Sequence, residues 1–218
     1  MKKAVVFDLD GTLSDSLVSI AYCANRALEA FGLVPFETDR YKYFVGDGAA
    51  ELIRRVLRGQ ATDRMDLYEQ VKAEYDRLFA VDCMYQVKPY DGIPELLALL
   101  KERGIKITVL SNKPHPNTCK VIHDLFGDDL FDVVQGQTGE IRKKPSPDGV
   151  FLISEKLGIP VSEMLYVGDT NTDMQTGKNA GAFTVGVLWG FRDRAELEAN
   201  HADAIIAHPR ELPDWLEQ

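Results

Sequence analysis

Two carboxylates follow the first apolar run of this sequence, and their spacing lets them act together. Residues 4–7 (AVVF) have the composition of a strand buried on both faces, and Asp8 and Asp10 come directly after it. Side chains alternate along an extended chain, so both carboxylates point one way while Leu9 points back toward the core. Gly11 then permits a sharp turn. We therefore expect a pair of acids at the carboxyl end of a buried strand, where open α/β sheets place their ligands.

Further polar residues stand where later apolar runs end. They are Ser111 with Asn112, Lys144 on a loop, and Asp169 with Asp173. Because the carboxyl ends of parallel strands share one edge of a sheet, these groups are expected to converge with Asp8 and Asp10. Crowded carboxylates repel, since two unit charges 4 Å apart interact by about 4 kcal/mol at an effective dielectric of 20. Oxygen ligands without His or Cys favour Mg²⁺ as the compensating cation, with Lys144 as a second positive charge.

This combination of residues suits the transfer of a phosphoryl group to a carboxylate. One aspartate would attack phosphorus and form an aspartyl phosphate. The other would give a proton to the departing alcohol and then take one from the attacking water. Mg²⁺ and Lys144 would offset the charge on the nucleophile and on the phosphoryl oxygens. The hydroxyl of Ser111 and the N–H groups that begin the next helix would hold another phosphoryl oxygen.

The four groups of residues resemble, in their order along the chain, the four motifs of the haloacid dehalogenase-like (HAD) hydrolase superfamily. The groups are Asp8-Leu9-Asp10-Gly11-Thr12, Ser111-Asn112, Lys144-Pro145 and Gly168-Asp169-Thr170-Asn171-Thr172-Asp173. The resemblance covers essentially the whole chain and implies that Asp8 is the nucleophile and Asp10 the general acid/base. It also implies that Mg²⁺ is held by the Asp8 carboxylate, the Asp10 carbonyl and Asp169, while Asp173 supports the site from further out. Dehalogenase chemistry is disfavoured, because those members lack the acid that Asp10 supplies.

Several of these residues also have simpler structural interpretations. Asp173 stands where it could cap a helix, and Ser111 is a possible N-cap. Lys144 follows two basic residues, 142–143, and a short basic run is usually a solvated loop. Only Lys144 directly precedes proline, which is why we choose it over its neighbours. Lys113, which follows Ser111 and Asn112, could lie near the same edge of the sheet, but a solvated lysine is the default expectation.

The elements that must position these residues alternate between strands and helices. The runs expected to be strands are residues 4–7, 105–110, 131–134, 164–167, 183–187 and 204–206. This alternation indicates βαβ units, and hence an α/β fold with a doubly wound, Rossmann-like parallel sheet. The segment that follows the first strand instead has helical periodicity throughout. We therefore predict a catalytic core of residues 1–14 and 85–218, with an all-helical cap, residues 15–84, inserted after the first strand.

The predicted cap is the natural place for substrate selection, because a core that handles any phosphate needs another element to choose the leaving group. A turn containing Gly46 and Gly48 resembles the cap loop of phosphoglycolate phosphatases. These glycines are candidate substrate-binding residues, as are Thr12 and Asn112 in the core. An ordinary turn with Asp47 as a helix N-cap is the competing interpretation. One of the arginines of the following helix (Arg54, Arg55 and Arg58) could face a substrate carboxylate, but a solvated face is the expected arrangement.

Composition limits the partners of the chain. Its 218 residues carry a formal net charge of −9, which disfavours nucleic acids and anionic membranes, and it has no apolar stretch of membrane-spanning length. Cys23, Cys83 and Cys119 lack paired spacing and are expected to be reduced packing residues of a cytoplasmic protein. The expected partner is a small phosphorylated metabolite, and nothing in the sequence indicates an oligomeric state.

Three classes of function remain open at this point. The favoured class is a Mg²⁺-dependent phosphomonoesterase, with 2-phosphoglycolate as the first choice of substrate. A sugar-phosphate mutase resembling β-phosphoglucomutase, or a pyrophosphatase, would use the same core. A phospho-accepting signalling domain is the non-enzymatic alternative, since it too combines acids, Ser/Thr and Lys on a parallel sheet. Such domains are shorter, lack a helical insertion, and lack an acid at the position of Asp10.

Overall fold

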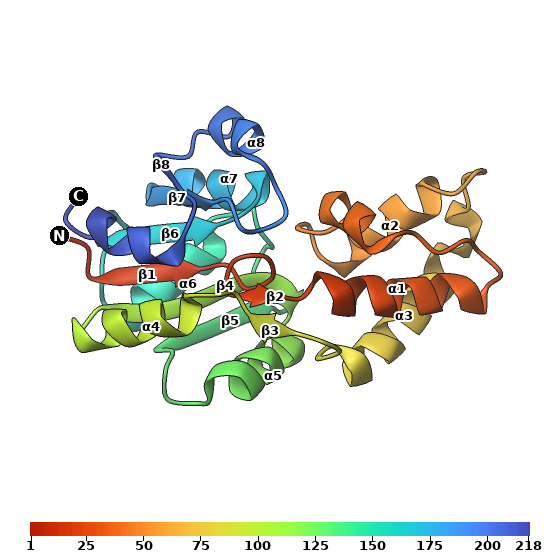
Figure 1. The fold of residues 1–218 in the computed structure, drawn as a ribbon, viewed down its shortest axis with the longest axis horizontal. Coiled ribbons are helices and arrows are strands. Elements are labelled where there is room, and N and C mark those ends of the chain that lie inside the picture. Colours follow the sequence, from red (N-terminus) through yellow and green to blue (C-terminus); the bar gives the residue numbers. More distant parts are fainter. The chain divides into compact units, whose positions relative to one another are not determined.

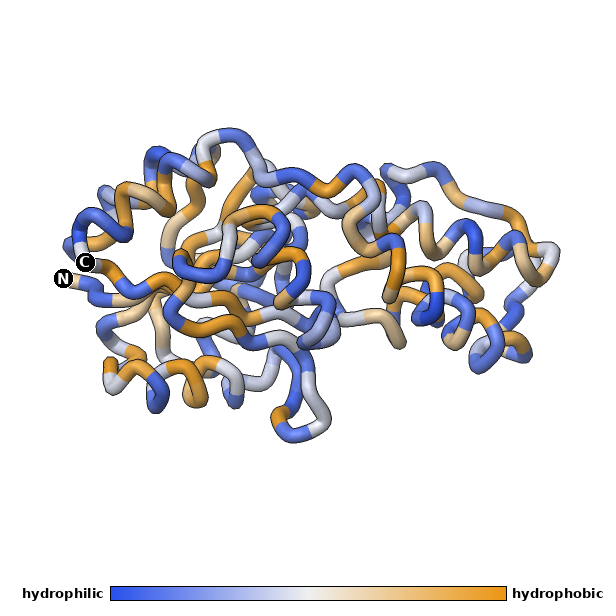
Figure 2. The backbone as a smooth tube through the Cα atoms, turned by 90° about the horizontal axis from the view of Figure 1, so that it is seen from below, coloured by the Kyte–Doolittle hydropathy of each residue, from blue (hydrophilic) through white to orange (hydrophobic).

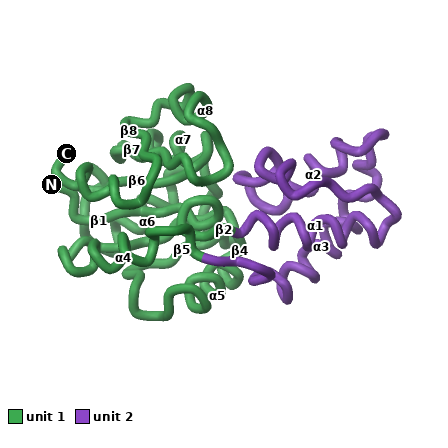
Figure 3. The backbone as a smooth tube through the Cα atoms, viewed as in Figure 1, with its two compact units in different colours: residues 1–15, 89–218 green, residues 16–88 purple.

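The computed structural model describes residues 1–218. The chain divides into two compact units, one made of residues 1–15 and 89–218 and the other of residues 16–88 (Figure 3). The first strand thus belongs with the second half of the chain, and the smaller unit interrupts the larger one in sequence.

A six-stranded sheet forms the centre of the larger unit. Its strands are β1 (Ala4–Phe7), β4 (Lys106–Pro114), β5 (Val133–Gln137), β6 (Met164–Gly168), β7 (Phe183–Val187) and β8 (Ala204–Ile206). They lie in the order β5-β4-β1-β6-β7-β8, and every neighbouring pair is parallel. The predicted α/β fold with a doubly wound parallel sheet is therefore confirmed. β4 and β5 follow one another on one side of β1, and β6, β7 and β8 follow one another on its other side. The strand order thus reverses at β1, and sheets of this kind bind ligands at such a point.

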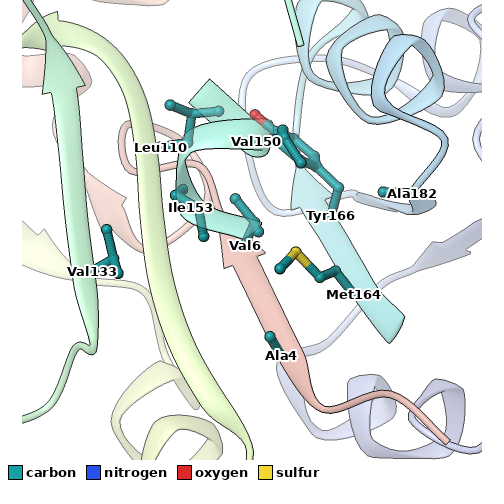
Figure 4. Packing of buried hydrophobic residues seen from close by; sticks show 9 residues of the cluster. All are labelled: Ala4, Val6, Leu110, Val133, Val150, Ile153, Met164, Tyr166 and Ala182. Carbon is teal, nitrogen blue, oxygen red and sulfur yellow. The ribbon is translucent and has the colours of Figure 1, made fainter. Parts of the chain in front are cut away.

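Helices flank this sheet (Figure 1). They are α4 (Ile93–Glu102), α5 (His115–Phe126), α6 (Asp148–Leu157), α7 (Asn171–Ala180) and α8 (Arg194–Ala199), with two 3₁₀ segments, η3 (Val161–Glu163) and η4 (Pro209–Trp215). On one face of the sheet, Ala4 and Val6 of β1 join Val150 and Ile153 of α6 in a buried cluster (Figure 4). The β1 residue between them, Val5, is also fully buried, so this strand is covered on both faces as its composition predicts.

The smaller unit is helical. It contains α1 (Leu17–Ala30), η1 (Thr38–Tyr43), α2 (Ala49–Arg58), η2 (Met65–Leu67) and α3 (Tyr68–Asp82). Its interior includes Tyr41, which has no exposed surface and whose hydroxyl donates a hydrogen bond to Asn25 of α1 at 2.7 Å. Two short strands, β2 (Ser14–Asp15) and β3 (Lys88–Pro89), pair with each other in a separate two-stranded sheet.

Apolar residues occur along the chain in short stretches separated by polar ones (Figure 2). None of the helices has both the length and the apolar character needed to cross a membrane. All three cysteines are free, and Cys23 and Cys83 are buried as predicted. Cys119 is exposed, so the prediction that it packs in the core is wrong. The buried residues of α5 are Thr118, Val121 and Ile122, and the helical rotation turns position 119 away from that face.

Candidate active site

Three aspartates meet where β1 and β6 end. Asp8 follows β1, Asp169 follows β6, and Asp173 lies in the first turn of α7. One carboxylate oxygen from each lies within 4.8 Å of the others, and all three side chains are buried. The N–H of Asp8 donates to the carbonyl of Val167 at 2.9 Å, so the pairing of β1 with β6 continues to this point. The sheet register thus brings together residues that stand far apart in the sequence.

Lys144 places a positive charge among these carboxylates. Its Nζ lies 2.7 Å from Oδ1 of Asp8 and 2.7 Å from Oδ1 of Asp173, and its side chain is only 3% exposed. The two basic residues before it, 142–143, are both exposed, so Lys144 alone of this run is buried. The choice of Lys144 over its neighbours on sequence grounds therefore corresponds to a real difference in environment.

Asn112 holds the backbone of Lys144 from both sides. Its Nδ2 donates to the Lys144 carbonyl at 3.2 Å, and the Lys144 N–H donates to its Oδ1 at 2.9 Å. The amide of Asn112 is therefore bound within the protein. Contact of Asn112 with a substrate stays a prediction, whereas its support of the Lys144 loop is a feature of the structure.

Burial and mutual repulsion change the pKa values of this cluster. Burial and the nearby Asp173 raise the pKa of Asp8 well above its usual range, although Lys144 opposes the rise. Burial, followed by the charge of Asp173, raises the pKa of Asp169 to about 7, against two hydrogen bonds that lower it. Burial alone would lower the pKa of Lys144, but Asp173 and Asp8 raise it well above its usual value. The three carboxylates are thus poorly compensated by one lysine.

Two loops hold the carboxylate of Asp169. The hydroxyl of Thr12 donates to its Oδ1 at 3.0 Å, and the N–H of Phe191 donates to its Oδ2 at 2.8 Å. Glycines pack against the same side chain, because a Cβ at Gly11 would lie 2.3 Å from Oδ2 and one at Gly190 would lie 2.3 Å from the Asp169 Cβ. Gly11 also has a φ of +93°, which other residues adopt at a cost. Thr12, predicted to bind substrate, is fully buried against Asp169.

Asp173 joins the cluster and caps a helix at the same time. Its Oδ2 accepts hydrogen bonds from the N–H and the hydroxyl of Thr170, at 3.1 and 2.6 Å, completing a capping box at the start of α7. Its Oδ1 accepts from Lys144 and, at 3.3 Å, from the hydroxyl of Tyr166. The interpretation of Asp173 as a helix cap is confirmed, and its contact with Lys144 shows that capping does not remove it from the cluster.

The carboxylate of Asp10 is not among the three but pairs with Lys113. Nζ of Lys113 lies 2.7 Å from Oδ1 of Asp10, and the two side chains are 3% and 17% exposed. The prediction that Lys113 is solvated is wrong, because β4 continues to Pro114, beyond the end predicted for it, and is buried along that extension. Leu110 pairs with Gln135 and Pro114 with Gln137, so three residues of β4 stand opposite one residue of β5.

The end of β4 carries three consecutive polar side chains that are buried, Ser111, Asn112 and Lys113. The whole strand from Ile107 to Lys113 is buried, as expected for a strand covered on both faces of the sheet. The hydroxyl of Ser111 accepts a hydrogen bond from the N–H of Lys113 at 3.2 Å. It is thus placed on the same sheet edge as Asp8, where a role in phosphate binding stays a prediction.

The two glycines predicted in the cap loop lie in the helical unit, just before α2. Gly46 and Gly48 have φ values of +111° and +84°, so this turn requires residues without a side chain. Gly48 occupies the N-cap position of α2, so the alternative in which Asp47 caps this helix is wrong. Asp47 instead forms a salt bridge with Arg55, whose guanidinium also donates to the carbonyl of Phe44 at 3.1 Å.

Sequence reasoning missed the loop that follows β7. Trp189 donates its indole N–H to the carbonyl of Thr12 at 3.0 Å, and the neighbouring Gly190 and Phe191 contact Asp169 as described above. The loop begins at the carboxyl end of a parallel strand, on the same sheet edge as Asp8. A glycine three residues after the end of such a strand, Gly190, was the available signal for a close approach of the backbone.

The donor set of the cluster fits a hard divalent cation. It consists of carboxylates, with no His or Cys, and such ligands suit cations of the Mg²⁺, Ca²⁺ and Mn²⁺ type. When all are ionised, three negative charges face the single positive charge of Lys144, which leaves two negative charges to be compensated. The arrangement can therefore hold a divalent metal ion beside a buried carboxylate, Asp8, that faces a lysine.

Comparison with known proteins identifies the same hydrolase family over most of the chain. The model of the haloacid dehalogenase-like hydrolase family matches residues 5–187. The phosphoglycolate phosphatase of Neisseria meningitidis serogroup A is 34% identical over 216 residues, which cover 98% of this chain and 88% of that protein. The N-acetylmuramic acid 6-phosphate phosphatase of Pseudomonas aeruginosa is 32% identical over 217 residues, covering 99% and 95% respectively.

Solved structures with the same fold also cover nearly the whole chain. A candidate phosphoglycolate phosphatase from Lactobacillus delbrueckii subsp. bulgaricus has a TM-score of 0.94 at 28% identity and covers 99% of each chain. CbbY from Rhodobacter sphaeroides, solved in complex with phosphate, has a TM-score of 0.80 at 26% identity and covers 97% of this chain and 96% of its own. These matches include the residues of both compact units.

Proposed function

The chain belongs to the haloacid dehalogenase-like hydrolase family and is an enzyme of its phosphatase group, and on this premise we propose that it is a Mg²⁺-dependent phosphatase of 2-phosphoglycolate. The observation that carries the proposal is the position of Asp8, whose carboxylate lies 2.7 Å from the ammonium group of Lys144 and within the three-aspartate cluster. A carboxylate held in this way can act as a nucleophile toward phosphorus. Relatives that are named phosphoglycolate phosphatases support the choice of substrate.

Asp8 and Asp10 divide the covalent chemistry between them. An oxygen of Asp8 forms a bond to phosphorus as the bond from phosphorus to the alkyl oxygen breaks, which leaves an aspartyl phosphate. Asp10 gives a proton to the departing oxygen, so that the product leaves as an alcohol. Water then attacks phosphorus while Asp10 takes a proton from it, which releases inorganic phosphate and restores Asp8.

The remaining polar residues bind and orient the phosphoryl group. Lys144 offsets negative charge on Asp8 and on the phosphoryl oxygens, and the hydroxyl of Ser111 donates to another phosphoryl oxygen. The carboxylates of Asp8 and Asp169 and the carbonyl of Asp10 would hold Mg²⁺, with Asp173 in support. When bound, the ion supplies positive charge to the phosphoryl oxygens and to the nucleophile.

The helical unit, residues 16–88, is proposed to act as the cap that selects the leaving group. The turn of Gly46 and Gly48 is the part of this unit that we assign to substrate contact. The salt bridge of Arg55 with Asp47 braces that turn from α2, which gives it a defined shape. The free cysteines agree with a reducing compartment, and we place the enzyme in the cytoplasm.

A phosphatase of N-acetylmuramic acid 6-phosphate is the second candidate. The relative that carries this name is 32% identical to the chain, close to the 34% of the first phosphoglycolate phosphatase. The core described above serves either reaction, because the two substrates differ only in the leaving group. Comparing the two esters directly therefore separates the candidates.

The test is phosphate release from a panel of small phosphate esters, with and without Mg²⁺. We expect the highest kcat/KM for 2-phosphoglycolate and no turnover after chelation of the metal. Asp8→Asn is expected to lower kcat by at least about 10³-fold, because it removes the nucleophile, while the unfolding midpoint is retained. Asp128→Asn, at a side chain that is 76% exposed, is the matched control. Retained phosphatase activity in Asp8→Asn would contradict the assignment, and a higher kcat/KM for N-acetylmuramic acid 6-phosphate would favour the second candidate.

A further inference from the structure

Lys113, which forms an ion pair with Asp10, has no role in the chemistry proposed above. The ammonium group lies 2.7 Å from Oδ1 of Asp10, and the lysine side chain is 3% exposed. The side chain of Lys113 is thus as buried as that of Lys144, but Lys113 pairs with Asp10 whereas Lys144 pairs with Asp8. A lysine is seldom buried to this extent unless a specific partner requires it.

The structure anchors Lys113 firmly before its side chain reaches Asp10. Its N–H donates to the hydroxyl of Ser111, and its carbonyl accepts a hydrogen bond from the hydroxyl of Thr118 at 3.2 Å. Gly136 of β5 lies so close that a Cβ there would come within 2.9 Å of the same carbonyl. The backbone at the end of β4 that carries Lys113 is therefore held by contacts with β5 and α5 as well as within β4.

The backbone of Asp10 is fixed by its turn, but its side chain has to be held in place by another group. Asp10 lies on the turn in which the N–H groups of Leu13 and Ser14 bond to the carbonyl of Leu9, so its backbone is fixed. Its carboxylate is 17% exposed and lies outside the three-aspartate cluster. Proton transfer requires the carboxyl group to lie within hydrogen-bond reach of the reacting oxygen, so rotation of this side chain would be costly to catalysis.

We infer that Lys113 is a positioning residue that holds the Asp10 carboxylate in place for proton exchange with the leaving-group oxygen. The ammonium group binds Oδ1 of the carboxyl group that exchanges the proton, and so limits the rotation of that group. This inference rests on the proposed function, because it assigns to Lys113 a part in the step that Asp10 performs there. Lys144 then offsets the charge of the nucleophile, Asp8, and Lys113 positions the general acid/base, Asp10.

The test compares Lys113→Met with Lys113→Arg on esters that differ in their need for a proton. The esters are 2-phosphoglycolate, a neutral alkyl phosphate and p-nitrophenyl phosphate, whose nitrophenolate leaves without protonation. The rate compared is that of the first step, measured as release of the leaving group in a single turnover, because the later attack of water on the aspartyl phosphate is common to all three esters. We expect Lys113→Met to lower this rate by about 10²-fold on both alkyl esters and by less than about 3-fold on the nitrophenyl ester. Lys113→Arg should recover part of the loss, because it keeps a cation near Asp10. Lys156→Met, on the exposed face of α6, is the matched control.

A double-mutant cycle shows whether Lys113 acts through Asp10. The variant Asp10→Asn/Lys113→Met should hydrolyse 2-phosphoglycolate as slowly as Asp10→Asn alone, since the group that Lys113 positions is already lost. This double variant removes both charges and so remains informative if Lys113→Met alone fails to fold with an uncompensated carboxylate.

Three results would overturn the inference while leaving the proposed function standing. The first is an equal loss of rate in Lys113→Met on all three esters. The second is that the losses of Asp10→Asn and Lys113→Met add in the double variant. The third is a loss confined to 2-phosphoglycolate, which would mean that Lys113 binds the substrate carboxylate. Absence of phosphate release by the wild-type enzyme from any ester would instead refute the proposed function, and the inference with it.

Discussion

The ammonium group of Lys144 lies 2.7 Å from a carboxylate oxygen of Asp173, whose side chain has no exposed surface. The same ammonium group reaches Asp8, so one lysine serves two buried carboxylates that belong to different elements of the fold. Its loop is held by Asn112, and its second partner is held by the capping box of α7. A substitution that breaks this arrangement is therefore expected to change both the free energy of unfolding and the catalytic activity.

Lys144→Met should strongly destabilise the folded protein at neutral pH. Removing one member of a buried ion pair leaves uncompensated charge, which typically costs about 3–5 kcal/mol of unfolding free energy. Added Mg²⁺ should restore part of that loss, because a cation then compensates the same carboxylates. Urea unfolding with and without Mg²⁺ measures both effects. The neighbouring Lys143→Met is the control, and a similar loss there would show that charge at this loop, rather than burial, matters.

Stabilisation of the protein by Mg²⁺ should increase with pH. The pKa of Asp169 is raised to about 7, first by burial and then by Asp173, whereas an ordinary aspartate titrates near 4. The folded state without metal therefore binds more protons than the unfolded chain between these values, and this carboxyl lowers the free energy of unfolding as the pH rises through that window. As the pH rises above about 7, a growing share of Asp169 is ionised, and protons compete less with the metal.

Thermal unfolding at pH 5.5 and 7.5 tests this dependence. The increase in Tm on adding Mg²⁺ should be larger at pH 7.5. Asp169→Asn should reduce the difference between the two pH values, since it removes the titrating group. An equal Mg²⁺ effect at both pH values in the wild-type protein would refute the role of Asp169 as a ligand whose proton competes with the ion.

Asn112→Ala should lower kcat more than its effect on stability would suggest. The substitution removes both hydrogen bonds to the Lys144 backbone, for an expected loss of about 1–3 kcal/mol in unfolding free energy. Lys144 then loses its fixed position relative to Asp8, and kcat should fall about 10²-fold, since small displacements of catalytic groups have effects of this size. Asn179→Ala removes an exposed hydrogen bond to the next residue of the loop, Pro145, and is the control. Equal kcat values for the two variants would contradict the bracing role of Asn112.

Gly190→Ala should disturb the site through Asp169. The added methyl group would lie 2.3 Å from the Asp169 Cβ and 2.4 Å from the carbonyl of Gly11, so one of the two loops must shift. We expect a loss of about 1–3 kcal/mol in unfolding free energy from overpacking and a weaker Mg²⁺ effect on Tm. Gly139→Ala, where nothing lies within 4 Å of the added Cβ, should change neither quantity. An unaltered Mg²⁺ effect in Gly190→Ala would show that this loop does not position the metal ligand.

The sequence was most informative where local composition is enough to specify the outcome. The apolar run of β1 and the alternation of strands and helices predicted the parallel sheet, because burial on both faces demands such runs. The convergence of Asp8, Lys144, Asp169 and Asp173 followed from the topology, since parallel strands end at one edge. Their catalytic roles, and the role of the helical unit as a cap, stay predictions that the experiments above test.

Predictions failed where the environment of a residue depends on strand pairing. Lysine is usually a solvated residue, but β4 continues beyond Leu110 and Lys113 is buried against Asp10 at its end. Cys119 was expected in the core and faces solvent, because the orientation of α5 on the sheet decides which side of the helix is covered.

The amino-acid sequence by itself determined the fold class, the order of the four polar groups and the excess of acid that calls for a cation. These follow from periodicity and from residue type, which are local properties of the chain. Only the tertiary structure decided which charges pair, that Asn112 braces Lys144, and that the loop of Gly190 closes on Asp169. Such contacts join residues distant in sequence, and their geometry depends on register, bulges and packing that arise only when the sheet is complete.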